Sequence, residues 1–244
     1  MVFWRQCPYS FHGIHAKISF LAKENKKKYK HIESFNPDVL SLEQSHQDFS
    51  YEMRLFDAGK GYENFNDFLN EEAFGYKDFG EGVTYVVWNV VYDRNHNEIG
   101  RDVVSYYTLA TTAIPYEDRI RLDEDEANKV GEAYDTKICG ISALEIKMFA
   151  VNSKYQDVFF EYEGENLPLS AWIMRSIIDY AHTLQNQVIG FKALFLHSLP
   201  EAENFYRENG FNVMEKNMQP LHCVDSEYKA MYLALKEVHM NYDK

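Results

Sequence analysis

Two side chains are candidates for proton transfer because packing alone does not explain them. Tyr206 lies in the aromatic run Asn204–Phe211, where its hydroxyl has no evident packing role. Glu145 is a carboxylate inside the apolar stretch Ala143–Val151. At neutral pH a phenol keeps its proton and a carboxylate has lost it. A phenol of this kind can give a proton to a leaving group, and a carboxylate can take one. The alternatives are core packing for the tyrosine and, for the glutamate, an ion pair with Lys147 or another cation.

The cysteines and the N-terminal histidines show no spacing typical of a metal site or a catalytic nucleophile. Cys7, Cys139 and Cys223 lie far apart, without CxxC or Cys/His spacing, so we expect free thiols and no zinc site or disulfide framework. His12 and His15 have no visible metal-binding partners, and we expect surface or core histidines. We therefore predict no metal site and no covalent cysteine intermediate.

His197 and Ser198 suggest a base beside a nucleophile, but they are adjacent on a predicted strand. Neighbouring strand residues point to opposite faces. We reject this pair as a catalytic unit.

Composition predicts one globular domain. The chain has 244 residues, 45% hydrophobic and 16% aromatic, with no repeat and no linker-like segment, so we assign 1–244 as one domain with 1–40 as an N-terminal extension. No run approaches the roughly 18 apolar residues of a membrane span, and no signal peptide is visible, so we expect a cytoplasmic protein. Its richness in Tyr and Phe is compatible with a homodimer.

The charge balance disfavours a nucleic-acid partner. The formal net charge is −13, whereas phosphate binding relies on clustered Lys and Arg. The one basic run, Lys23 to Lys30, contains five lysines and has the character of a solvated helix face or loop. The acidic balance instead favours a cationic partner.

Periodicity predicts a mixed order of helices and strands. The first half contains two helices within Ser41–Phe74, a hairpin of Val83–Tyr92 and Ile99–Ala113, an acidic loop or short helix at Asp118–Glu132, and a third strand at Ser142–Val151. The second half contains the helix Leu169–Leu184 with Ser170 as N-cap, the strand Phe191–His197, the helix Pro200–Asn209 and the strand Tyr228–Leu235.

This succession resembles the fold of the GNAT superfamily of N-acetyltransferases from about residue 45 to residue 235. The most specific piece is Asn204–Phe211, which looks like the FYxxxGF ending of the family's last helix, where Gly210 supplies the left-handed helix end. The resemblance implies an α/β (α+β) fold with a mixed, mostly antiparallel central sheet and helices on both faces. It also implies that Tyr206 protonates the departing thiolate of CoA.

The third strand resembles the family's central strand, which pairs with the pantetheine arm of acetyl-CoA. The resemblance implies contacts from Phe149, Ala150 and Val151, and a general-base role for Glu145. Strict alternation would place Leu144, Ile146 and Met148 on one face, opposite Glu145, Lys147, Phe149 and Val151.

The sequence departs from the family directly after this strand. Family members hold the pyrophosphate with a Q/R-x-x-G-x-G/A loop and the following helix N-terminus. Here Tyr155 and Gln156 begin that loop, but an acidic, aromatic insertion, Val158–Leu167, replaces the glycines. Ser170 and Ala171 still offer backbone donors at the start of the helix.

The N-terminal half carries a weaker resemblance to the acetyltransferases of toxin–antitoxin pairs, which modify aminoacyl-tRNA. The similar segments are Leu55–Gly59, Asn66–Ala73 and Tyr106–Ala110. Those relatives are typically basic where this chain is acidic, so the similarity supports the fold more than the substrate.

From the sequence we therefore predict acetyl transfer from acetyl-CoA, as cosubstrate, to a primary amine by direct attack. The expected partner is an amine-bearing small molecule or peptide. One alternative is a GNAT-fold protein that binds without catalysis, motivated by the missing glycine loop. A second is a toxin-type aminoacyl-tRNA acetyltransferase.

Overall fold

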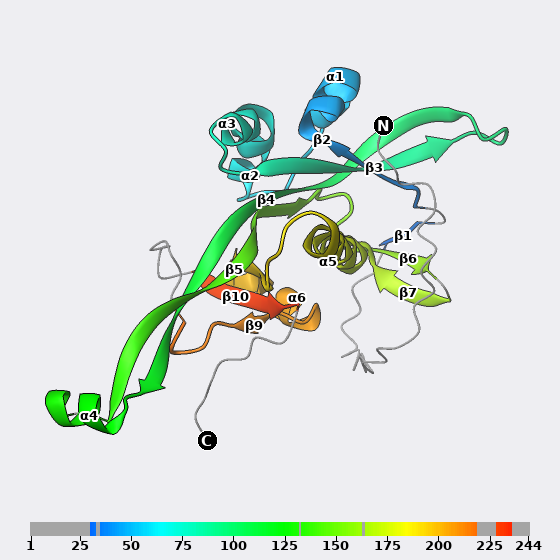
Figure 1. Cartoon of the computed structure of the whole chain (residues 1–244). Coiled ribbons are helices and arrows are strands. Elements are labelled where there is room, and N and C mark those ends of the chain that lie inside the picture. The colour runs from blue at the N-terminus through cyan, green and yellow to red at the C-terminus, as the bar shows by residue number, and fades with distance from the viewer. Residues whose placement is uncertain (1–29, 33–34, 132, 163, 219–227, 236–244) are drawn as a thin grey trace.

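The protein is described here by a computed structural model that covers residues 30–32, 35–131, 133–162, 164–218 and 228–235. A seven-stranded sheet in the order β2-β3-β4-β5-β8-β10-β9 forms its centre (Figure 1). All neighbouring strands of this sheet are antiparallel except β5 and β8. The strands are β2 (Pro37–Ser41), β3 (Val83–Tyr92), β4 (Glu98–Arg121), β5 (Tyr134–Val151), β8 (Ala193–Ser198), β9 (Asn212–Val213) and β10 (Lys229–Ala234).

Helices cover both faces of the sheet, as the sequence predicts. On one face lie α1 (Leu42–Met53) and a continuous helical segment made of α2 (Glu63–Asp67), a π-helical turn (Phe68–Glu72) and α3 (Ala73–Asp78). On the other face lie α5 (Leu169–Gln187) and, after a 3₁₀ turn at Pro200–Ala202, α6 (Glu203–Glu208) (Figure 1). A buried apolar cluster lies on each side, because strand side chains alternate between the faces.

A small second sheet, in the order β1-β6-β7, packs beside α5. It consists of β1 (Lys30–His31), β6 (Val158–Tyr162) and β7 (Glu165–Pro168). Phe35 and Phe160 pack edge-on against Trp172 of α5. The insertion after the central strand is therefore a folded hairpin, and the end of the predicted extension 1–40 supplies strands to both sheets. Most of that extension lies outside the described residues.

The hairpin of β4 and β5 is much longer than predicted and extends away from the main sheet as an arm (Figure 1). Its strands pair without interruption from Ala113–Ser142 to Arg121–Tyr134, and α4 (Glu124–Val130) closes its tip. The prediction of an acidic loop or short helix over Asp118–Glu132 is correct only for α4. The residues from Asp118 to Arg121 are acidic in part, but their backbone hydrogen bonds to β5 keep them extended as a strand.

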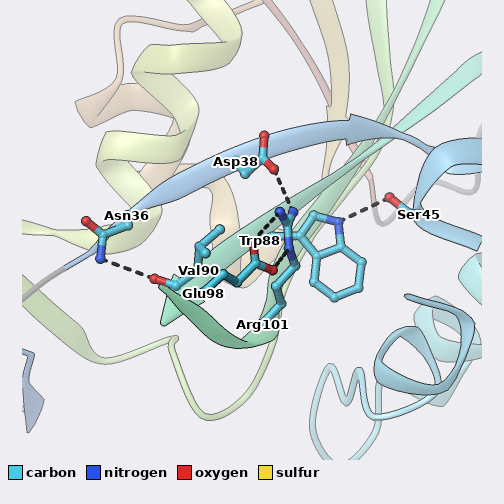
Figure 2. Close-up of polar contacts among 7 residues, drawn as sticks. All are labelled: Asn36, Asp38, Ser45, Trp88, Val90, Glu98 and Arg101. Atoms are coloured by element: carbon cyan, nitrogen blue, oxygen red, sulfur yellow. Dashed lines mark hydrogen bonds and ion pairs between the residues drawn. The ribbon is translucent and has the colours of Figure 1, made fainter. Parts of the chain in front are cut away.

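The half-buried Arg101 of β4 fastens the edge strand β2 to the sheet. Its guanidinium binds Asp38 of β2 at 2.6 Å and Glu98 at 2.5 Å (Figure 2). It also lies 4.4 Å from the ring centroid of Phe49. The same hydrogen bonds lower the pKa of Glu98 and raise that of Arg101. Nearby, the indole N–H of Trp88 donates to Ser45 in α1 (Figure 2). These contacts tie β2 and α1 to β3 and β4.

We predict that Arg101→Ala lowers the free energy of unfolding by about 2 kcal/mol, because two carboxylates lose their shared partner in a partly desolvated site. Urea unfolding followed by circular dichroism measures this. The matched control is Arg94→Ala in the exposed turn between β3 and β4, expected to change stability by less than about 0.5 kcal/mol. Equal losses of stability in the two variants would contradict the role of Arg101 in fastening β2 to the sheet.

Candidate functional site

The strands β5 and β8 run side by side only briefly and then separate. They pair from Ala143–Ala193 to Ile146–Leu196, and no ladder continues beyond Ile146. On its other edge β5 stays paired with β4 up to Val151. Within the described part of the chain, one edge of the segment from Lys147 to Val151 is therefore free of a neighbouring strand.

A β-bulge at Lys147 accompanies this separation. Thr108 of β4 faces Met148, whereas the next residue, Leu109, faces Ile146, so Lys147 is the extra residue. Such a bulge bends the strand and increases its local twist. The bend turns the end of β5 away from β8.

The bulge makes the prediction of strict alternation along β5 wrong. Leu144 and Ile146 pack into the cluster beneath α5, and beyond the bulge Phe149 and Val151 pack into that same cluster. Met148 instead joins the cluster on the opposite face. The physical reason is the extra residue, which reverses the facing of every side chain that follows it.

A cavity of about 630 Å³ opens where the two strands part. Its wall comes from both faces of the sheet. Phe149, Val151, Ser170 and Tyr206 belong to the α5 side, whereas α2 contributes Asn64 and Phe65 from the other side. The remaining lining residues are Ile146, Lys147, Met148, Gln156, His197, Leu199, Glu201, Ala202, Phe205 and Tyr228. The cavity therefore connects the two faces of the sheet.

Tyr206 is held in this cavity by aromatic contacts. Its ring packs edge-on against Phe205 at 5.2 Å and Phe211 at 5.8 Å, and Phe205 stacks on Phe149 of β5 at 5.9 Å. Its side chain is buried, which raises the pKa of the phenol well above its usual value. Among the described residues its hydroxyl has no hydrogen-bond partner. Tyr206 is thus a protonated phenol at a cavity wall.

Glu145 lies beside the cavity and not in its wall. It is buried on the face of β5 opposite Leu144, and its carboxylate lies 3.7 Å from Nδ1 of His197. Lys147, the partner considered from the sequence, instead places its ammonium 5.4 Å from the ring centroid of Tyr76. His197 itself lines the cavity.

The turn after β5 is fastened to the loop before α2. The amide of Gln156 donates to the carbonyl oxygens of Ala58 and Val151, and Ser153 donates to the carboxylate of Asp57. The backbone N–H of Gly59 and the Ser153 hydroxyl hold the pKa of Asp57 below its usual value. This places Gln156 in the cavity wall. Tyr155 does not reach the cavity, because its hydroxyl donates to Asp102 at 3.0 Å.

The acidic insertion does not crowd the start of α5. In the β6–β7 hairpin Phe159 pairs with Pro168 at the base, and Glu165 lies at the tip, three residues before Pro168. At about 3.3 Å per residue this is a distance of roughly 10 Å. The helix begins after Pro168, whose side chain makes no capping bond, so the predicted N-cap at Ser170 is wrong. Ser170 lies in the first turn and lines the cavity.

The structure therefore gathers part of the predicted site. Of the residues expected to contact a cofactor, Phe149, Val151, Gln156 and Ser170 line one cavity with Tyr206. The remaining three, Ala150, Tyr155 and Ala171, are not in its wall. Within the described ranges no group of three or more His, Cys, Asp or Glu side chains could hold a metal ion.

Several lining residues escaped the sequence reasoning. Asn64, Glu201 and Tyr228 carry no motif, and they meet only because the chain folds α2 and the segment after β8 to the same opening. The Tyr62 hydroxyl donates to Glu201 at 2.7 Å and joins these two segments. His197 was visible in the sequence, but only as the neighbour of Ser198.

Solved structures with a similar fold come from toxin-type acetyltransferases. AtaT complexed with acetyl-methionyl-tRNAfMet is 18% identical, with a TM-score of 0.50 over 82% of this chain and 95% of the other. A bacterial toxin (16% identical, TM-score 0.49, 82% and 92% covered) and AtaTR bound with AcCoA (17%, 0.49, 82% and 93%) are also similar. No protein-family model matches the chain, and no curated protein sequence matches it significantly.

The chain therefore has the GNAT fold, as its sequence predicts. No helix in the described part of the chain is long and apolar enough to span a membrane.

The expectation of a small amine or peptide partner, with nucleic acid disfavoured, is wrong. AtaT, which has this fold, is solved in complex with an acetylated aminoacyl-tRNA. The net charge of the chain is not a sufficient criterion for excluding a nucleic-acid partner. Net charge sums the whole surface, whereas a nucleic acid senses the local field around the site that it contacts.

Gly210 is the residue that ends α6 and returns the chain into the core beside Tyr206. Its φ of +92° belongs to the left-handed region, which a side chain disfavours. We predict that Gly210→Ala lowers the free energy of unfolding by about 1 kcal/mol. Thermal or urea unfolding measures the loss.

The control is Gly190→Ala, where φ is not positive and a Cβ meets nothing within 4 Å. That substitution is expected to be nearly neutral. A stability loss at Gly190 as large as at Gly210 would contradict the role given to the left-handed turn.

Proposed function

We propose that this protein is an acetyl-CoA-dependent N-acetyltransferase whose acceptor is the primary amine of an aminoacyl-tRNA. The observation that carries the proposal is the cavity at the parting of β5 and β8, with an unpaired strand edge on one side and the protonated phenol of Tyr206 in its wall.

The free edge of β5 suits the pantetheine arm of the cosubstrate. This arm contains amide groups, which can pair with the exposed backbone between Lys147 and Val151 as an added strand would. Phe149 and Val151 line that edge and offer apolar contact. The arm would bring its thioester toward Tyr206.

The start of α5 offers the positive end of a 19-residue helix to the phosphates of CoA. Ser170, in the first turn of α5, lines the same cavity as Phe149 and Val151. Glu165 lies at the tip of its hairpin and not at the helix start, so distance weakens its repulsion of an anion there. The helix start and the turn at Gln156 together substitute for the missing glycine loop.

Tyr206 would act as the general acid. When an amine attacks the thioester carbonyl, the carbon–sulfur bond breaks and the sulfur leaves with the electron pair. Because burial keeps the phenol of Tyr206 protonated, it can give its proton to that sulfur. No covalent enzyme intermediate is needed, since the amine attacks directly.

The acceptor would enter from the face that carries α2. There the cavity is lined by Asn64, Phe65, Lys147 and Glu201. Glu201 attracts a cationic amine, whereas Lys147 offers a charge for a phosphate. The likeness to AtaT with its bound product-like tRNA supports an aminoacyl-tRNA as this acceptor.

We predict that Tyr206→Phe lowers kcat for acetyl transfer by about 10²-fold, because the sulfur loses its proton donor, with little change in the Kd for acetyl-CoA. A thiol-release assay and calorimetry measure the two quantities. Tyr92→Phe, on an exposed strand end, is the control and should behave as the wild type. Absence of acetyl-CoA binding at millimolar concentration would instead indicate a GNAT fold without catalysis.

We further predict that the wild-type protein transfers a radiolabelled acetyl group to aminoacyl-tRNA and not to the same tRNA without its amino acid. Binding to the tRNA should weaken by about tenfold to hundredfold between about 50 mM and about 200 mM salt, because phosphate contacts release counterions. Transfer to no aminoacyl-tRNA, or binding that does not depend on salt, would contradict this acceptor.

A further inference from the structure

His197 occupies a place in the cavity wall that its packing does not explain. It lies on β8 on the same face as Phe195, whose ring meets the imidazole edge-on at 4.8 Å. The side chain is 15% exposed, and among the described residues its Nε2 is buried without a hydrogen-bond partner. A buried polar atom without a partner costs about 1–3 kcal/mol. Because His197 lines the cavity, a turn of its ring toward the cavity would let a bound ligand supply the missing partner.

Glu145 lies behind this imidazole. Its side chain is 9% exposed, it is not part of the cavity wall, and its carboxylate lies 3.7 Å from Nδ1 of His197. Because a nearby carboxylate favours a proton on Nδ1, the lone pair of the neutral ring is left on Nε2. Glu145 is not part of the cavity wall, whereas His197 lines it.

We propose that His197 is the base that removes the proton from the attacking amine, and that Glu145 is a positioning residue that orients its ring. This inference rests on the proposed acetyl transfer. It moves the role of base from the carboxylate suggested by the sequence to the imidazole beside it.

Each proton has a destination in this scheme. The neutral amine attacks the thioester carbonyl carbon, and its nitrogen becomes positively charged as the nitrogen–carbon bond forms. Nε2 of His197 takes a proton from that nitrogen, the carbon–sulfur bond breaks, and the sulfur takes the phenolic proton of Tyr206. The imidazolium then returns its proton to the tyrosinate through water, so amine and thioester become amide and thiol.

The titratable residues near His197 come from three neighbouring segments. Glu145 and Lys147 lie on β5, Glu201 lies in the 3₁₀ turn, and Tyr228 precedes β10. On β10 itself, Ala230 faces His197 in the ladder and carries no charge.

The test compares variants of the full chain, with acetyl-CoA and an aminoacyl-tRNA as substrates. We expect His197→Gln to lower kcat by about 10²-fold or more, with unchanged Kd for acetyl-CoA. His197→Gly should fall similarly and recover as free imidazole is added. Glu145→Gln should lower kcat less and should not respond to imidazole. The control, His182→Gln on α5 outside the cavity, should keep the wild-type rate.

The outcomes separate this inference from the function on which it rests. A wild-type rate in His197→Gln, or a His197→Gly variant that binds acetyl-CoA normally but is not rescued by imidazole, would overturn the role of His197 alone. A wild-type protein that transfers no acetyl group would overturn the proposed function and this inference with it. A loss of rate with imidazole rescue supports both.

Discussion

The extra residue at Lys147 in β5 is the constraint on which the site depends. Because Thr108 and Leu109 of β4 pair with residues on either side of it, the strand bends and its outer edge leaves β8. Without that bend the parallel ladder could continue, and the cavity would be closed by strand pairing. The two faces of the sheet meet in one opening for this reason.

The elements around the opening hold it in shape. Phe205 of α6 stacks on Phe149 of the central strand and meets Tyr206 edge-on, which joins that strand to α6. Gln156 joins the end of the strand to the loop before α2. On the α2 side, the hydrogen bond from Tyr62 to Glu201 joins the start of α2 to the 3₁₀ turn after β8. The proposed cosubstrate and acceptor would therefore approach from opposite faces, with His197 and Tyr206 on different sides of the reacting carbon.

Local patterns in the sequence were sufficient for the fold but not for the shape of the site. The periodicity of α5 and the aromatic run around Tyr206 are local features, so both elements were predicted near their observed places. A bulge is a one-residue difference between two paired strands, which one strand alone cannot reveal. The faces of Phe149 and Val151 were therefore assigned wrongly. Tyr155 likewise lies in the turn after β5 as expected, but its hydrogen bond to Asp102 of β4 joins residues far apart in the sequence, so no local pattern indicates it.

The measurement that tests the central claim most directly is a crystal structure with a thioether analogue of acetyl-CoA, which binds but cannot transfer its acetyl group. The account predicts that the pantetheine arm lies along Lys147–Val151 between β5 and β8, with the analogue's sulfur within hydrogen-bond reach of the Tyr206 hydroxyl. An analogue bound elsewhere, or one whose sulfur lies away from Tyr206, would contradict it.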